Sequence, residues 1–321
     1  MAKPWKIRGL RPESSVSAGI ARIIKTRCAE MYSYADKTLI PGDPEALHDM
    51  RVSSRRLQAV LKIHRESFPP RKFRRIYTPL RDLIKALGMV RELDVFLQSL
   101  QLHQRENQNI PEETLRPLVA QCEHERTGHR KNLDTLIRTL VAGDYQREVH
   151  DFVNLYLKET ADRTGRASRQ KSFRQFGAWL IPRLYDRFAD RRAEVIRHPQ
   201  QWKELHNMRI AGKPLRYAME IYEVAYGRTF RECLEHVKLV LDTMGFLHDT
   251  DVALGKLHAY ERSLSVLTDQ AIANTQHESV RALIELYARE RSDLFRKFAA
   301  VMGEWKKNKF RRKLMKSLRH N

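Results

Sequence analysis

The sequence has few cysteines and no long apolar run, and each shortage excludes a class of protein. Its three cysteines, Cys28, Cys122 and Cys233, lie far apart and form no C-x-x-C pair. This argues against a disulfide framework or a zinc site and indicates reduced thiols in a cytosol. No segment approaches the roughly 18 apolar residues of a membrane span, and residues 1–15 lack the apolar core of a signal peptide. We therefore expect a soluble, cytoplasmic protein.

Signatures of catalytic and nucleic-acid sites are also missing. The 13 glycines form no G-x-x-x-x-G-K-[ST] loop, and neither H-E-x-x-H nor G-x-S-x-G occurs. Helix-turn-helix spacing, zinc fingers and aromatic RNA-binding strands are not visible. No segment shows the period of two that is typical of a strand. The sequence therefore predicts an all-α protein with no catalytic chemistry and no cofactor.

Positive charge is what the sequence has in excess. Lys and Arg number 60 against 39 Asp and Glu, which gives a formal net charge of +21. Such an excess says nothing about the fold, but it favours a polyanionic partner. That partner is a nucleic acid, an anionic membrane or a phosphate polymer.

The chain contains an internal repeat. The segment LHDMRVSSRRLQAVLKIHRESFP, residues 47–69, returns in altered form as LHNMRIAGKPLRYAMEIYEVAYG, residues 205–227, at an offset of 158 (206 − 48). A second block follows each copy: LGMVRELDVFLQSL begins at Leu87 and MGFLHDTDVALGKL at Met244, at an offset of 157. A period of this size indicates a duplicated domain-sized unit with a pseudo-twofold, and not a solenoid.

Helical spacing places the repeated cations on one face. Positions i, i+3 and i+7 share a side of a helix, beside a stripe of apolar positions. The first copy contributes His48, Arg51 and Arg55, and the second contributes His206, Arg209, Lys213 and Arg216. The two copies keep the same positions cationic, whereas a merely solvated face would be free to exchange Lys for Glu. This pattern favours a ligand-binding face; a buried, hydrogen-bonded role for the histidines is equally open.

The paired H-x-M-R and K-x-L-R-Y segments, each followed by a G-x-x-x-D/E-x-D-V block, resemble the CHAD domain from about Ser14 to about Val301. The resemblance implies two four-helix bundles related by a pseudo-twofold, with basic residues lining a central cleft or pore. It also implies binding of inorganic polyphosphate and association with polyphosphate granules and their proteins. Some members are fused to a triphosphatase domain, whose E-x-E-x-K strand pattern is absent here, so the chain is similar to a free-standing member.

The resemblance also implies the binding residues. Carried onto this sequence, they are Lys25, His48, Arg51, Arg55, Arg183, His206, Arg209, Lys213 and Arg216, with Arg56, Arg81 and Lys238 as further candidates. One position departs from the first copy, because Pro214 stands where Arg56 stands. A proline inside a helix removes a hydrogen bond and kinks the helix at a cost of about 3 kcal/mol, which puts the participation of Arg216 in doubt.

The expected organisation has five parts. They are a basic arm (1–13), a first helical half (14–160), a linker (161–172), a second half (173–302) and a basic amphipathic tail (303–321). Helices are expected over 14–39 and 173–196, among others, and Asp43-Pro44 and Pro199 are expected to begin the two repeated helices. The tail is either an ordinary closing helix or an auxiliary contact to a polyanion or a membrane surface.

Three other functions compete with polyphosphate binding. Nucleic-acid binding would use the same charge, at least weakly and non-specifically at low salt. A docking protein that anchors partners on granules is a second alternative. A His-Asp metal phosphohydrolase is a third, because His248-Asp249 resembles such a pair. The repeat argues against it, since the first copy has Arg91-Glu92 at these positions, which favours ordinary polar residues on a helix surface.

Overall fold

The computed structural model describes residues 4–40, 43–106, 110–164, 171–264 and 270–319. Throughout these ranges the regular structure is helical and no β-strand forms; an isolated bridge joins Ser15 to Ser172. The all-α prediction is therefore confirmed. Of the helices in these ranges, none combines the length and apolar character needed to cross a membrane.

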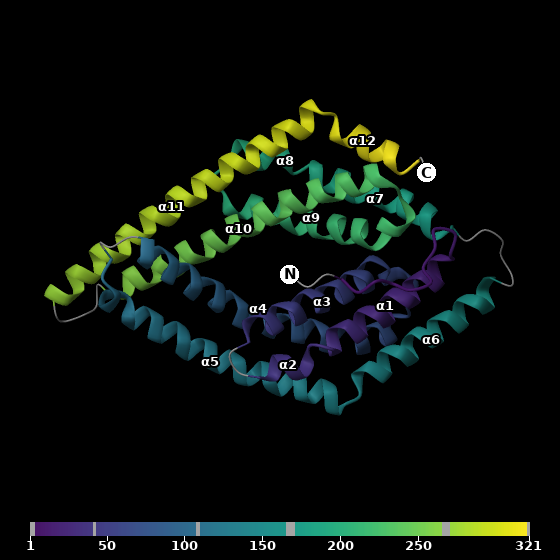
Figure 1. Ribbon diagram of the computed structural model, residues 1–321, viewed down its shortest axis with the longest axis horizontal. Coiled ribbons are helices and arrows are strands. Elements are labelled where there is room, and N and C mark those ends of the chain that lie inside the picture. Colours follow the sequence, from purple (N-terminus) through teal and green to yellow (C-terminus); the bar gives the residue numbers. More distant parts are fainter. Residues whose placement is uncertain (1–3, 41–42, 107–109, 165–170, 265–269, 320–321) are drawn as a thin grey trace.

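The helices form two layers, one from each half of the chain (Figure 1). The first half comprises α1 (Val16–Tyr32), α2 (Ala35–Leu39), α3 (Pro44–Ile63), η1 (Arg65–Ser67), α4 (Pro70–Glu106), α5 (Glu112–Ala142) and α6 (Tyr145–Thr164). The second half comprises α7 (Phe173–Ala189), α8 (Arg192–Arg197), α9 (Trp202–Tyr222), η2 (Glu223–Ala225), α10 (Arg228–Leu264), α11 (Gln270–Lys307) and α12 (Phe310–Ser317).

The order and length of the elements repeat between the halves. Helices α1 and α7 both have 17 residues, α4 and α10 both have 37, and α3 and α9 have 20 and 21. A one-turn 3₁₀ helix follows α3 and α9 alike. Corresponding helices also touch across the seam between the layers, where α3 packs on α9, α1 on α7 and α4 on α10. The repeat in the sequence is thus a repeat in the secondary structure.

The helix starts have local causes, with one departure from expectation. The Asp43 side chain caps α3 by accepting hydrogen bonds from the backbone N–H groups of Glu45 and Ala46, at 3.1 and 2.9 Å. Helix α9 begins at Trp202 and not at Pro199. The Pro199 carbonyl instead accepts a hydrogen bond from Arg291 of α11, at 3.0 Å.

Two expected helices are interrupted, and the expected tail is packed. The segment 14–39 divides after Tyr32, where the Ser33 hydroxyl donates to the Glu30 carbonyl at 2.8 Å. The segment 173–196 likewise divides after Ala189 into α7 and α8. At the chain end α12 packs on α10 and α11 and buries its apolar side chains, Phe310, Leu314 and Leu318. These side chains are therefore not free to enter a membrane.

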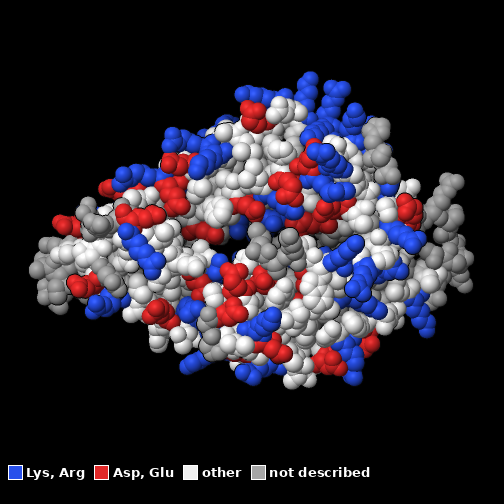
Figure 2. Space-filling model, in the orientation of Figure 1, with Lys and Arg blue, Asp and Glu red and all other residues white. Residues whose placement is uncertain are grey.

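Two apolar clusters hold the layers together, and each contains residues of both halves. In α4 the larger cluster extends to Val90 and the smaller one begins at Leu93. In α10 the larger one extends to Leu247 and the smaller one begins at Ala253. Figure 2 shows a hollow near the middle of this face, where the two layers meet. The segments of α4 and α10 between the clusters carry the polar residues described next.

Candidate functional site

Ionisable side chains from four helices meet between the two apolar clusters, at the seam between the two layers. This seam cluster consists of His48, Arg51 and Arg55 of α3, Arg91 of α4, His206, Arg209 and Lys213 of α9, and His248 and Asp249 of α10. Its members lie close enough to shift one another's pKa. The ring centroids of His206 and His248 are 5.3 Å apart, so α9 and α10 are in direct contact here.

The apolar stripes of α3 and α9 orient these side chains. Met50 and Leu57 of α3, and their counterparts Met208 and Leu215 of α9, are buried in the core. Because α3 and α9 pack on each other, the neighbouring face of each helix turns toward the other copy. The repeated cations lie on this face, so duplication brings two cationic rows together.

The cations of the seam cluster lack carboxylate partners. Within the described ranges, Arg51, Arg55, Arg91, Arg209 and Lys213 form no ion pair and no side-chain hydrogen bond. The Nε atom of Arg51 is buried with no hydrogen-bond partner. A buried donor without an acceptor is costly, typically about 1–3 kcal/mol and more for a charged group. This arrangement is what a site needs when its acceptors are supplied by a ligand.

Mutual repulsion adds to this cost. The pKa of Lys213 is lowered to about 7, chiefly by burial and further by the positive charges of Arg209, Arg55 and Arg51. Burial and the charge of Arg55 likewise lower the pKa of Arg51 to about 10. Asp249, the acidic residue beside them, has a raised pKa because desolvation of its carboxyl outweighs the effect of the nearby arginines. An anionic ligand would therefore relieve repulsion that the free protein contains.

The pKa of each histidine in the cluster is lowered, which favours the neutral form. Burial, followed by the charge of Arg91, lowers the pKa of His48; burial and Arg209 lower that of His206. Burial, followed by the charge of Arg209, lowers the pKa of His248 to about 4. The Nδ1 atoms of His48 and His206 are buried without partners. In the part of the chain that the structure covers, no group of three or more His, Cys, Asp or Glu residues is placed to hold a metal ion.

Two of the predicted binding residues have carboxylate partners inside the fold. Arg56 donates to the buried Glu30 at 3.3 Å, and Arg27 holds the other oxygen of the same carboxylate. Arg216 contacts Glu220 at 2.9 Å and Asp242 at 2.7 Å. Helix α9 continues through Pro214, so the partners of Arg216, and not an interruption of the helix, distinguish it from Lys213.

Four other predicted residues lie apart from the cluster. Arg81 pairs with Asp82, and Lys238 with Glu235, on the outer sides of α4 and α10. Lys25 donates to Asn154 of α6 at 2.7 Å. Its counterpart Arg183 donates to the Trp179 carbonyl at 2.6 Å and stacks over the Trp179 ring.

Sequence reasoning missed the contribution of α4 and α10. It interpreted His248 and Asp249 as ordinary helix-surface residues and did not select Arg91, yet all three lie in the seam cluster. The signal was present in the repeat, because the offset of 157 pairs Arg91 with His248 and keeps a basic residue at both positions.

The repeated aspartates of the second block have a structural role. Asp94 of α4 pairs with Arg126 of α5, and Asp251 of α10 pairs with Arg291 of α11. Arg291 is buried and also bonds the Pro199 carbonyl ahead of α9. These ion pairs fix α5 and α11 to the two long helices whose middle segments line the seam.

Comparison with known proteins agrees with this architecture. The chain is 22% identical to the CHAD domain from the plant Ricinus communis, over 94% of this chain and 97% of that one, with a TM-score of 0.69. It is 14% identical to PptA from Streptomyces chartreusis, over 88% of this chain and all of that one, with a TM-score of 0.58. At such identities these likenesses show the fold alone. No curated protein matches the chain.

The family profile described as the CHAD domain matches residues 23–258. This range includes the repeated cationic helices α3 and α9 and most of α10, and it covers well over half of the chain. The chain therefore belongs to the CHAD domain family.

Proposed function

We propose that this protein binds inorganic polyphosphate through the seam cluster. The observation that carries the proposal is the set of unpaired cations on facing helices, Arg51 and Arg55 of α3 with Arg209 and Lys213 of α9. They lie between two apolar clusters, beside a hollow (Figure 2). Arg81 and Lys238, which lie outside the seam on two of the long helices, have acidic partners instead.

The chemistry of the cluster suits a phosphate polymer. Each internal phosphate of such a chain carries roughly one negative charge and offers no base edge to read, so recognition depends on the density and spacing of cations. The guanidinium of an arginine forks onto two phosphate oxygens, and a lysine supplies a mobile point charge. Two facing rows of cations would therefore hold successive phosphates of one chain. Family membership supports this ligand, because the resemblance to CHAD domains implies polyphosphate binding.

The proposal includes the cellular setting and the absence of catalysis. We infer that the protein acts by binding, as a cytoplasmic protein of polyphosphate granules that docks other granule proteins there. Catalysis by a His-Asp metal centre is not proposed, since the histidines of the seam stand beside unpaired arginines that repel a metal cation.

The finer architecture is also part of the proposal. We infer two four-helix bundles related by a pseudo-twofold axis near the contact of α3 with α9. The duplicated order of elements and the contact between corresponding helices support it. The boundaries proposed for the five parts are 1–13, 14–160, 161–172, 173–302 and 303–321.

Direct binding with matched charge variants tests the function. Fluorescence anisotropy of labelled long-chain polyphosphate would compare the wild type with the double variants Arg51→Gln/Arg209→Gln and Arg81→Gln/Lys238→Gln. Both double variants remove two positive charges, but only Arg51→Gln/Arg209→Gln removes them from the seam. We expect the seam variant to lose affinity by about a hundredfold, at about 1.4 kcal/mol for each tenfold, and the control by less than threefold. Equal losses in the two variants would contradict the proposal.

Non-specific nucleic-acid binding is the second candidate, and a separate surface favours it. Exposed basic residues gather where α7 and α8 meet the end of the chain (Figure 2): Arg187, Arg191, Lys306, Lys307, Lys309 and Arg312. This surface lies outside the seam. Weak binding of RNA or DNA there should survive the seam variant and fall steeply with salt.

A further inference from the structure

One side chain of the seam cluster can react as well as bind. Among the unpaired cations of the cluster, Lys213 is the amine, and its counterpart in the first repeat is Arg55. A guanidinium stays protonated in proteins, whereas an amine that loses its proton becomes a nucleophile. The two repeats therefore keep the charge at this position but not the chemistry.

The backbone of α9 holds this amine in place. At the preceding residue, a Cβ added to Gly212 would clash with the Leu241 side chain and lie 3.0 Å from the Phe188 ring. The helix therefore packs tightly on α10 and α7 here, an approach for which glycine leaves room. Lys213 is half-buried and faces the seam instead, where it forms no ion pair and no side-chain hydrogen bond with any described residue.

The surroundings of Lys213 favour its neutral form. The groups that face it are Arg209 and His206 of α9, Arg51 and Arg55 of α3, and His248 and Asp249 of α10. Burial, followed by the charges of the three arginines, lowers the pKa of Lys213 to about 7, and Asp249 opposes this only in part. About half of the amine is therefore unprotonated at pH 7, against roughly one in two thousand for a lysine with the ordinary pKa of about 10.4. Desolvation beside other cations activates a lysine as a nucleophile.

The three arginines select the electrophile. Guanidinium groups fork onto the oxygens of a phosphate, so a small molecule that carries a phosphate would be held beside the amine. In an acyl phosphate the reactive carbonyl carbon is joined directly to a phosphate oxygen. Binding of the phosphate therefore brings this carbon to the amine, and the surrounding cations stabilise the charge that develops on the leaving group. An acyl donor without a phosphate gains neither advantage.

We propose that Lys213 is an acylation site that reacts directly with small acyl phosphates bound by the seam arginines. The unprotonated amine attacks the carbonyl carbon, a C–N bond forms, and the bond between that carbon and the phosphate oxygen breaks. The nitrogen loses one proton and the departing phosphate gains it. The products are an N-acyl-lysine and hydrogen phosphate, and the step needs no further reactant.

The rate of this reaction should rise with pH. A bound phosphate favours the protonated amine and raises the pKa of Lys213 above its value in the free protein. The reactive form of the complex is therefore the minor one at pH 7 and gains population as the pH increases. Measurements at pH 8 have more of this form than measurements at pH 7.

Acylation would also regulate the seam. An amide carries no charge, so the α9 row of Arg209 and Lys213 would lose one of its two unpaired cations. This consequence rests on the function proposed above: acylated protein should bind polyphosphate about tenfold more weakly. Polyphosphate that already occupies the arginines should in turn protect Lys213 from acylation.

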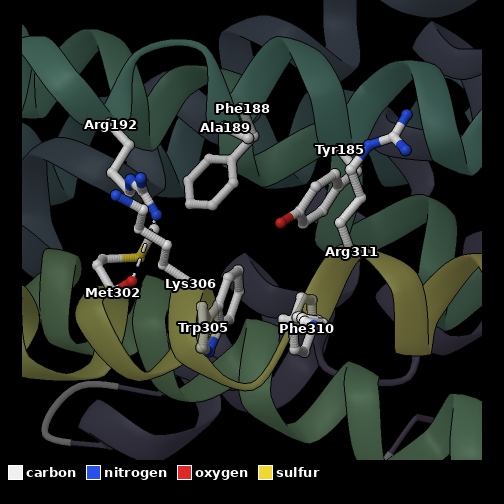
Figure 3. Close-up of a pocket in the computed structure, with 10 residues that line it drawn as sticks. Tyr185, Phe188, Ala189, Arg192, Met302, Trp305, Lys306, Phe310 and Arg311 are labelled. Carbon is white, nitrogen blue, oxygen red and sulfur yellow. Dashed lines mark hydrogen bonds between the residues drawn. The ribbon is translucent and has the colours of Figure 1, made fainter.

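Lys306 provides a matched comparison within the same chain. It lines the pocket between α7, α8, α11 and α12 together with Arg192 and Arg311 (Figure 3). It forms no ion pair with any described carboxylate, but it is exposed. Lys306 therefore shows what neighbouring arginines do without burial. Lys131 of α5, which is also exposed and has no described ion pair, serves as an ordinary amine.

Acetyl phosphate tests the reaction in the absence of polyphosphate. The full chain at pH 8 would be treated with acetyl phosphate and digested at acidic residues, and mass spectrometry would give the rate of acetylation at each lysine. We expect Lys213 to react at least tenfold faster than Lys306 and Lys131. Its rate should saturate with reagent concentration and fall when inorganic phosphate is added, whereas the rates at Lys306 and Lys131 should stay proportional to concentration. Acetic anhydride, which has no phosphate, should prefer Lys213 at least fivefold less than acetyl phosphate does.

Variants separate the arginines from the fold. In Arg51→Gln/Arg209→Gln the rate at Lys213 should fall at least tenfold and no longer saturate. Arg81→Gln/Lys238→Gln, which removes two charges outside the seam, should react at Lys213 as the wild type does. Thermal unfolding shows whether each variant is folded.

The possible outcomes distinguish this site from the proposed function. The acylation site is overturned if Lys213 is not acetylated, if its rate does not saturate, if Lys306 reacts as fast, or if acetic anhydride shows the same preference. A wild type that binds no polyphosphate yet reacts saturably at Lys213 would contradict the proposed function and leave the acylation site standing. Lys213→Gln mimics the uncharged amide, and unchanged polyphosphate affinity in this variant would overturn the regulatory consequence.

Discussion

The His64 Nε2 atom and the Tyr222 hydroxyl lie 3.1 Å apart in the core, and the two residues are separated by 158 positions. The same offset relates His48 to His206, so these are corresponding residues of the two repeats in contact with each other. A residue and its repeat counterpart can touch only where the two copies meet. This contact therefore lies at the interface of the duplicated halves, in the larger apolar cluster to which Tyr222 belongs.

The protein should lose stability in mild acid because of His64. Burial lowers the pKa of His64 to about 3, whereas an unfolded histidine has a pKa of about 6.5. Between these values the unfolded chain binds a proton that the folded chain does not, so stability is full above pH 6.5 and falls as the pH decreases toward 3. The slope is about 1.4 kcal/mol per pH unit.

Denaturant unfolding at pH 7, 6, 5 and 4 would measure this slope. His64→Gln keeps an amide that can bond Tyr222 but does not titrate, so its stability should depend less on pH over the same interval. The difference between the two slopes removes the contribution of the other histidines, which both proteins share. Parallel curves for the wild type and the variant would show that His64 is not responsible.

Arg55 and Arg56 should behave oppositely although they are adjacent. Arg56 donates to the buried Glu30, whereas Arg55 has no partner in the described part of the chain. Arg56→Gln should therefore reduce the free energy of unfolding by about 1–3 kcal/mol and leave polyphosphate affinity within twofold. Arg55→Gln should weaken polyphosphate binding about tenfold and leave stability equal or higher, because it removes repulsion.

Urea unfolding and anisotropy on the same two proteins separate these roles, and Glu30→Gln provides a control. It leaves Arg27 and Arg56 without their shared carboxylate and should destabilise the protein by about 3 kcal/mol or more without a specific loss of binding. If Arg56→Gln lost affinity as Arg55→Gln does, Arg56 would be a ligand contact and its pairing with Glu30 would be incidental.

Polyphosphate binding should take up protons near neutral pH. Lys213 has a pKa of about 7 in the free protein, so about half of it is neutral at that pH. A bound polyanion favours the charged form and raises this pKa. Affinity should therefore be highest below pH 7 and decrease as the pH rises, by up to tenfold per unit until the pKa of the bound state is passed.

Calorimetry at pH 7.5 in buffers of different ionisation enthalpy measures the proton uptake. The wild type should take up a fraction of a proton for each site filled, and Lys213→Arg, which stays charged, should take up less while binding at least as tightly. The histidines of the seam are present in both proteins, and Lys213→Arg keeps the positive charge that faces His206 and His248. Identical uptake by the wild type and the variant would exclude Lys213 as the titrating group.

Much of the fold follows from the sequence, because its signals are local. Helical periodicity and the cap at Asp43 predicted α3, and the fixed offset predicted a second copy of it at α9. The cationic face was also visible, since the exchange of Arg55 for Lys213 keeps the charge while changing the residue. These features depend on residues close together in the chain, or on a comparison of the chain with itself.

What the sequence did not reveal depends on contacts between distant segments. Nothing near Arg56 indicates that Glu30, on another helix, would pair with it, and nothing near Arg216 points to Asp242. Likewise, His248 belongs to the seam only because α10 packs beside α9. The apolar side of α12 looked free for a membrane surface until Leu314 was seen buried on the rest of the protein.

The measurement that tests the central claim most directly is competition binding at about 150 mM salt. Labelled long-chain polyphosphate, bound to the wild type or to the double variant Arg51→Glu/Arg209→Glu, would be challenged with single-stranded RNA and duplex DNA. If the seam cluster is a dedicated polyphosphate site, neither nucleic acid displaces the label from the wild type and the variant no longer binds it. If all three polyanions compete equally and the variant binds as the wild type does, the repeated cations serve the fold and the binding is non-specific.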